Sequence, residues 1–135
     1  MEIKWINISK HSDERGSLLV AEAQKNIPFD IKRVYCLYGM HLEPRGFHAH
    51  KELQQVMICL SGHCDVILDD GSEKKTVSVD RNQKGLLIDK MIWHEMHNFS
   101  ENCVLMVLAS DWYNENDYLR NYLDFMALNN TLKII

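Results

Sequence analysis

The sequence predicts an all-β protein, an antiparallel barrel or sandwich of short strands that ends in one helix. Strand-like segments rich in β-branched and aromatic residues recur over roughly the first 110 residues, with turn signals between them. Only near the C-terminus do apolar residues fall three and four positions apart. With 135 residues, 46% of them hydrophobic, the chain is long enough for one core, so we expect one domain over residues 1–135.

Six segments carry the strand signal. Each is short and apolar or alternating, and Asp69-Asp70-Gly71-Ser72 between two of them is a strong hairpin signal. The expected strands cover residues 31–38, 54–60, 64–68, 75–79, 86–88 and 104–108. Strands are therefore expected over about residues 1–110.

The C-terminal segment predicts a helix over about residues 115–128. Its apolar positions are three and four apart, which is typical of an amphipathic helix, and Asn114 or Asn116 would cap it. These positions are Leu119, Tyr122, Leu123 and Met126. We expect this helix to cover an open edge or end of the barrel.

Composition excludes several classes of function. A net charge of −4 disfavours binding of nucleic acid. The sequence has no run of 18 apolar residues, so it predicts no membrane-spanning helix. The N-terminus has no apolar signal segment, and the four cysteines form no CxxC pair. We therefore expect a cytoplasmic protein with reduced thiols.

Two short blocks of sequence that each contain two histidines are the candidates for a catalytic site. His48 and His50 are two residues apart, so on a strand both imidazoles face the same side, into the barrel. His94 and His97 follow in the second block. Because an imidazole titrates near pH ~6.5, two on one face predict a proton relay.

The two blocks resemble the two motifs of the cupin superfamily. The matching residues are His48, His50 and Gly62 in the first block, and Gly85, His94 and Asn98 in the second. The sequence departs from the motif at Gln54 and Gln55, where a Glu is expected, and residues 82–84 lack the proline of the second motif. A neutral amide brings no charge to a divalent ion, so a metal site of His48, His50, Gln55 and His94 is disfavoured.

A closer resemblance is to the nucleotide-sugar 3,4-ketoisomerases of this superfamily. Residues 44–71, 93–100 and 107–125 carry it, including RGFHAHK and WHEMHNFS, and it extends over residues 6 to about 128. The resemblance implies a double-stranded β-helix (jelly-roll) barrel that shifts the carbonyl of dTDP-4-keto-6-deoxy-D-glucose from C4 to C3. It also implies no metal or other cofactor, and a homodimer that exchanges N-terminal strands. A downstream aminotransferase would use the product for 3-amino-3,6-dideoxy sugars of O-antigens and S-layer glycans.

The resemblance also implies roles for individual residues. His48 would be the base at C3 and His50 a relay, with His94 completing a hydrogen-bond chain and Tyr35 donating to the enolate oxygen. The predicted substrate-binding residues are Arg15, Arg33, Arg45 and Gln55, since arginine matches the geometry of phosphate. The Arg15-Gly16 pair resembles the members of the family that form the galacto product.

Two other functions remain as alternatives. One is a metal-dependent cupin enzyme such as a dioxygenase, and the other is a non-catalytic cupin that binds a nucleotide sugar. The related 3,5-epimerases use a His–Asp dyad and a Tyr, but no Asp stands next to His48 in the sequence.

Overall fold

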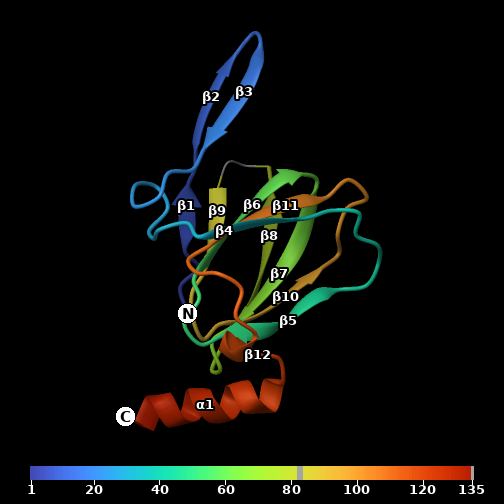
Figure 1. Cartoon of the computed structure of the whole chain (residues 1–135). Coiled ribbons are helices and arrows are strands. Elements are labelled where there is room, and N and C mark those ends of the chain that lie inside the picture. The colour runs from blue at the N-terminus through green and yellow to red at the C-terminus, as the bar shows by residue number, and fades with distance from the viewer. Residues whose placement is uncertain (82–83, 135) are drawn as a thin grey trace.

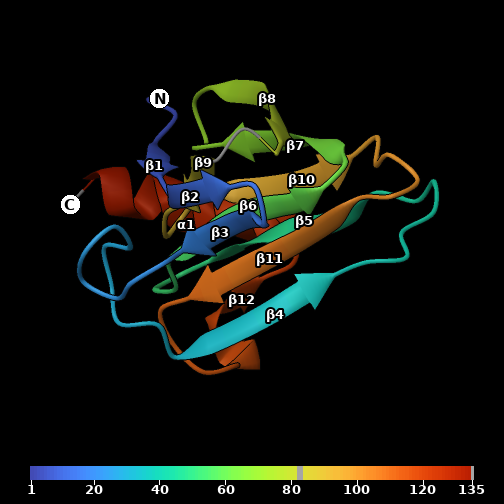
Figure 2. The same ribbon diagram turned by 90° about the horizontal axis from the view of Figure 1, so that it is seen from above.

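The computed structural model describes residues 1–81 and 84–134, so part of the 82–84 stretch of the second motif lies outside the described residues. Two five-stranded antiparallel sheets face each other (Figures 1 and 2), which confirms the predicted jelly-roll class. The first sheet has the order β1 (Trp5–Asn7), β9 (Lys84–Ile88), β6 (Gln55–Ser61), β11 (Val104–Ala109), β4 (Arg33–Leu37). The second has the order β12 (Tyr118–Leu119), β5 (Arg45–His50), β10 (Trp93–His97), β7 (His63–Asp69), β8 (Lys74–Asp80).

The core lies between the two sheets. Strand alternation sends Leu105 and Val107 of β11 inward from the first sheet, and Cys64 and Val66 of β7 inward from the second. Strand β6 is central in its sheet and buried over most of its length, so its sequence reads as a continuous apolar run. This packing fixes the register of the strands that carry the histidines.

A separate hairpin stands outside the barrel. Strands β2 (Ser9–Asp13) and β3 (Gly16–Val20) pair only with each other among the described strands. Figure 1 shows this blue hairpin extending well beyond the two sheets. Leu18 and Leu19 on β3 are both exposed, so the apolar side chains of the hairpin are not buried against the barrel of the same chain.

The predicted helix over residues 115–128 is wrong at both ends and at the expected core position Leu123, whereas Met126 packs against the core as expected. Helix α1 spans Tyr122–Ile134, and the polar run before it forms a short 3-10 turn, Glu115–Asp117, that Asn114 caps. The next residues pair with β5 as strand β12, because an edge partner in the second sheet overrides the local helical spacing. Leu123 is 76% exposed, whereas Phe125 is completely buried.

Helix α1 packs across one end of the barrel (Figure 1), as expected. Phe125 lies in a cluster with Trp93 and Ala49, and Asn129 Nδ2 donates a hydrogen bond to the Asp70 carbonyl over 2.7 Å. A Cβ at Gly71 would lie 1.7 Å from that same amide nitrogen, so only glycine at this hairpin position leaves room for Asn129 of the helix. Among the described residues, no helix has the length and apolar character needed to cross a membrane.

Candidate active site

Three histidines meet inside the barrel on neighbouring strands. His48 and His94 are register partners on β5 and β10, and their ring centroids are 4.5 Å apart. His50 lies further along β5, with its ring 5.0 Å from that of His48. Ring nitrogens of the three lie within 4.8 Å of one another. His97, the fourth histidine of the two blocks, instead contacts Glu95 through Nε2 at 2.9 Å.

A β-bulge in β5 sets the direction of the His48 side chain. The pairing with β10 shifts between His94 and Glu95, and Phe47 takes a φ of 59° that non-glycine residues seldom adopt. Gly46 has a φ of 94°, and a Cβ there would lie 3.0 Å from the His94 carbonyl oxygen. The extra residue reverses the in–out alternation, so Arg45 and His48 line the same pocket.

The neighbours of His48 and His94 set the tautomers of both rings. His48 Nδ1 is 3.0 Å from the Gly46 carbonyl oxygen, and His94 Nδ1 is 3.1 Å from that of Ile92. A carbonyl only accepts, so Nδ1 carries the proton and Nε2 keeps a lone pair in each ring. Burial lowers the pKa of His48 and brings that of His94 to about 3, so both rings are neutral at cellular pH.

The opposite sheet supplies a hydrogen-bond donor. Tyr35 faces inward from β4, and the Gln55 amide on β6 donates to its phenolic oxygen over 2.6 Å. Burial raises the pKa of Tyr35 to about 12, so the phenol keeps its proton. Gln55, predicted as a substrate-binding residue, is itself buried and acts here on the orientation of Tyr35.

A pocket of about 250 Å³ opens between the two sheets beside these groups. His48 and Tyr35 line it, together with three arginines, Arg33, Arg45 and Arg120. The buried Nε of Arg33 has no hydrogen-bond partner among the described residues. The pocket thus combines a neutral base, a phenol and guanidinium groups that suit an anionic ligand.

Comparison with known proteins gives the family. Residues 1–130 match the model described as "FdtA: WxcM-like, C-terminal". The chain belongs to the WxcM-like FdtA family. A relative from Aneurinibacillus thermoaerophilus, TDP-4-oxo-6-deoxy-alpha-D-glucose-3,4-oxoisomerase, is 55% identical over 126 residues, which cover 93% of this chain and 91% of the relative.

Solved structures of related enzymes have the same fold. A 3,4-ketoisomerase from Helicobacter canadensis superposes with a TM-score of 0.92 at 47% identity, covering 96% of this chain and 98% of that one. A mutant of the 3,4-ketoisomerase QdtA from Thermoanaerobacterium thermosaccharolyticum, in complex with TDP-4-keto-6-deoxyglucose, also gives 0.92, at 38% identity and with coverages of 96% and 94%.

Four residues beside the FdtA-family site were missed by sequence reasoning, which placed them in the predicted helix. Arg120 donates from Nε to Glu115 over 2.6 Å, and its guanidinium lies 4.2 Å from the ring centre of Tyr118. Tyr118 pairs with His50 across β12 and β5, and Asp117 precedes it. The polar run from residue 114 to residue 117 was the one available sign of a turn in place of a helix.

Arg15 is the one predicted site residue that this chain does not bring to the histidine cluster. It lies at the tip of the β2–β3 hairpin, is 85% exposed, and pairs with Asp13 over 2.6 Å. The open hollow that it lines, of about 550 Å³, is made of hairpin residues alone. That Arg15 binds substrate therefore stays a prediction.

The three imidazoles can also be compared with a cupin metal centre. Their lone pairs and spacing suit a divalent ion, and His48, His50 and His94 would hold it. Among the described residues, no carboxylate oxygen belongs to this group of ligand atoms; the Asp117 carboxylate contacts His50 at Nδ1, 3.4 Å away. A bound ion would polarise a substrate oxygen, but three neutral imidazoles would bring no negative charge into direct contact with it.

Proposed function

We propose that this protein is a sugar-nucleotide 3,4-ketoisomerase that converts dTDP-4-keto-6-deoxy-D-glucose into a dTDP-3-keto-6-deoxyhexose. The observation that carries the proposal is the pairing of a neutral His48, with a free lone pair on Nε2, and the protonated phenol of Tyr35 in one pocket. A base facing a donor is what the transfer of a proton next to a carbonyl requires.

The reaction proceeds through an enediol. The carbonyl at C4 acidifies the hydrogen on C3, and His48 Nε2 removes it as a proton while the C3–H electron pair forms the C3–C4 double bond. Tyr35 donates a hydrogen bond to the oxygen on C4 as negative charge develops there. The O3 proton is then lost, O3 becomes the carbonyl oxygen, and C4 takes a proton from the imidazolium. His50 and His94 relay protons between the two oxygens.

The stereochemistry supports the galacto product. In the gluco substrate the hydrogen on C3 lies on the lower face of the sugar ring. In a galacto product the hydrogen on C4 lies on that same face, whereas in a gluco product it lies on the opposite face. One imidazole can therefore remove the first proton and deliver the second, and His48 is well placed for both steps.

The arginines of the pocket are proposed to bind the diphosphate of the substrate. Arg33, Arg45 and Arg120 all line the pocket that holds His48. Arginine binds phosphate oxygens in a bidentate manner, and burial of part of Arg33 strengthens such contacts. Arg120 joins the two predicted arginines in this role.

A homodimer that exchanges its N-terminal hairpins would complete the site. The β2–β3 hairpin projects from its own barrel with Leu18 and Leu19 exposed, which favours a second copy of this chain as the cover. In this arrangement Arg15 reaches the pocket of the partner. We place the enzyme in the cytoplasm, ahead of an aminotransferase that builds 3-amino-3,6-dideoxy sugars for O-antigen or S-layer glycans.

The test couples the enzyme to a 3-aminotransferase, with EDTA present, and follows the dTDP-3-amino sugar by proton NMR. The coupling constant of the hydrogen on C4 then separates the galacto product from the gluco product. Substrate deuterated at C3 should pass part of its label to C4, because one imidazole carries the proton. Binding of substrate without turnover would instead favour the non-catalytic nucleotide-sugar-binding cupin.

A metal-dependent cupin is the second candidate function, favoured only by the spacing of the three imidazoles. It predicts a stoichiometric divalent ion after purification without chelator, and activity that EDTA abolishes and the metal restores. Full activity in EDTA would remove this candidate.

A further inference from the structure

His50 is the group whose surroundings the mechanism leaves unexplained. Its side chain is 2% exposed, and neither ring nitrogen has a hydrogen-bond partner among the described residues. Burying an imidazole without partners is costly, so an unpaired ring at a catalytic centre calls for a physical reason. Burial, reinforced by His94 and His48, lowers the pKa of His50 to about 2, so the ring is neutral.

Asp117 is the carboxylate nearest to this ring. Its Oδ2 lies 3.4 Å from His50 Nδ1, slightly beyond an ordinary hydrogen bond, and both residues line a second cavity of about 350 Å³. A carboxylate at this position can only accept, so it favours the tautomer with the proton on Nδ1. The lone pair of His50 then lies on Nε2, as it does in His48 and His94.

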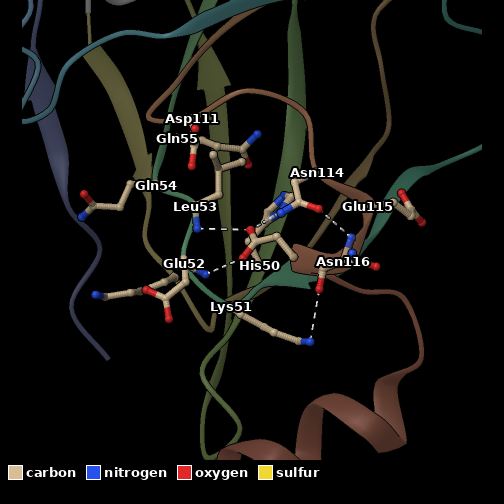
Figure 3. A network of polar contacts seen from close by, with 12 residues as sticks. His50, Lys51, Glu52, Leu53, Gln54, Gln55, Asp111, Asn114, Glu115 and Asn116 are labelled. Atoms are coloured by element: carbon tan, nitrogen blue, oxygen red, sulfur yellow. Dashed lines mark hydrogen bonds and ion pairs between the residues drawn. The ribbon is translucent and has the colours of Figure 1, made fainter.

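The chain holds Asp117 firmly in this position. Its carboxylate oxygens accept hydrogen bonds from the backbone N–H groups of Glu52 over 2.8 Å and Leu53 over 3.2 Å, directly after β5. Its own carbonyl accepts from the Lys51 backbone N–H over 3.0 Å. Figure 3 shows how the segment after His50 lies against the 114–116 turn, with Lys51 reaching the Asn116 carbonyl at 3.2 Å.

We propose that Asp117 is a positioning residue that keeps the proton of His50 on Nδ1 and thereby presents the Nε2 lone pair to the reacting histidines. The proposal rests on the ketoisomerase function above. When His48 takes the proton from C3, its ring becomes a cation 5.0 Å from the ring of His50, and a lone pair on His50 turned toward that cation stabilises it electrostatically. The negative charge of Asp117 behind His50 stabilises that cation. With the opposite tautomer, His50 would turn an N–H toward the imidazolium and would repel it.

The Asp117→Asn variant tests the proposal, because it removes the charge and keeps the size of the side chain. It also replaces one of the two oxygens that accept from the Glu52 and Leu53 backbone N–H groups, so urea unfolding is used to check that the fold is kept. We expect kcat to fall roughly a hundredfold with little change in KM, since His50 stabilises charge that develops only during the reaction. Asp117→Glu, which keeps the charge, should recover part of the loss. Asp111→Asn is the matched control, because Asp111 lines the same cavity without a contact to His50 and should leave kcat unchanged.

Nitrogen-15 NMR of the histidine side chains supplies a readout that a merely structural role would not move. The wild-type protein should carry the His50 proton on Nδ1, and Asp117→Asn should shift it to Nε2, while Asp111→Asn should not. A wild-type His50 protonated on Nε2, or an unchanged kcat in Asp117→Asn, would overturn the proposal. The tautomer is measured without turnover, so an enzyme with another activity would refute the function and leave this measurement standing.

Discussion

The barrel interior and the β2–β3 hairpin differ in how they contribute to the site. Inside the barrel, His48, His94 and Tyr35 are fixed by strand register, by a bulge and by burial between two sheets. The hairpin pairs only with itself among the described strands and leaves Arg15 in solvent. One chain therefore brings the three histidines and Tyr35 together by itself, whereas the hairpin would contribute to a site only through the dimer that we propose.

The largest effect on activity is expected from His48→Asn. The change lies inside the barrel, so it should leave the hairpin and the proposed dimer intact. Asparagine keeps a polar group but cannot take the proton from C3, so kcat should fall about 10²–10⁴-fold. The coupled aminotransferase assay measures the rate, and circular dichroism with ultracentrifugation checks the fold and the dimer. Activity above a tenth of the wild-type rate would exclude His48 as the base.

The second effect concerns the hairpin alone. Leu18→Asp places a charge where we expect the partner subunit to cover an apolar side chain that is 60% exposed in one chain. Losing the burial of one leucine costs about 1.5–3 kcal/mol. Because both subunits of the dimer carry the change, the dimer should weaken about 10²–10⁴-fold. Sedimentation at several concentrations measures this. Leu123→Asp on α1 is the control, and equal behaviour of the two variants would contradict exchange through the hairpin.

The third effect belongs to the interior and depends on pH. His50 and His94 have pKa values lowered by burial to about 2 and about 3, while unfolded histidines titrate near 6.5. The unfolded state therefore binds more protons, so stability is lost as pH falls below 6.5. Each histidine should cost about 2 kcal/mol of unfolding free energy between pH 7 and pH 5. Urea unfolding of wild type and His94→Gln measures the slope, which should become shallower in the variant.

Sequence reasoning worked where the local pattern and the tertiary structure agree. Alternating segments became strands, and the two-residue spacing of His48 and His50 placed both rings in the interior. It failed at residues 115–121, because the pairing of Tyr118 with His50 is a long-range contact that local spacing does not report. Asp117 and Arg120 were missed for the same reason. Both were assigned to the helix, so the local pattern offered no sign that they lie beside the histidines.

The last and smallest effect joins the two regions. Arg15→Ala removes a guanidinium that we expect to reach the pocket of the partner, so kcat/KM should fall about tenfold while the folded barrel is unchanged. Mixed dimers of Arg15→Ala with His48→Asn decide where Arg15 acts. If the hairpins exchange, one site of each mixed dimer has both an intact His48 and the intact Arg15 of its partner, and activity rises above the sum of the separate variants. If Arg15 serves its own barrel, every mixed dimer keeps a defect in both sites, and mixing restores nothing.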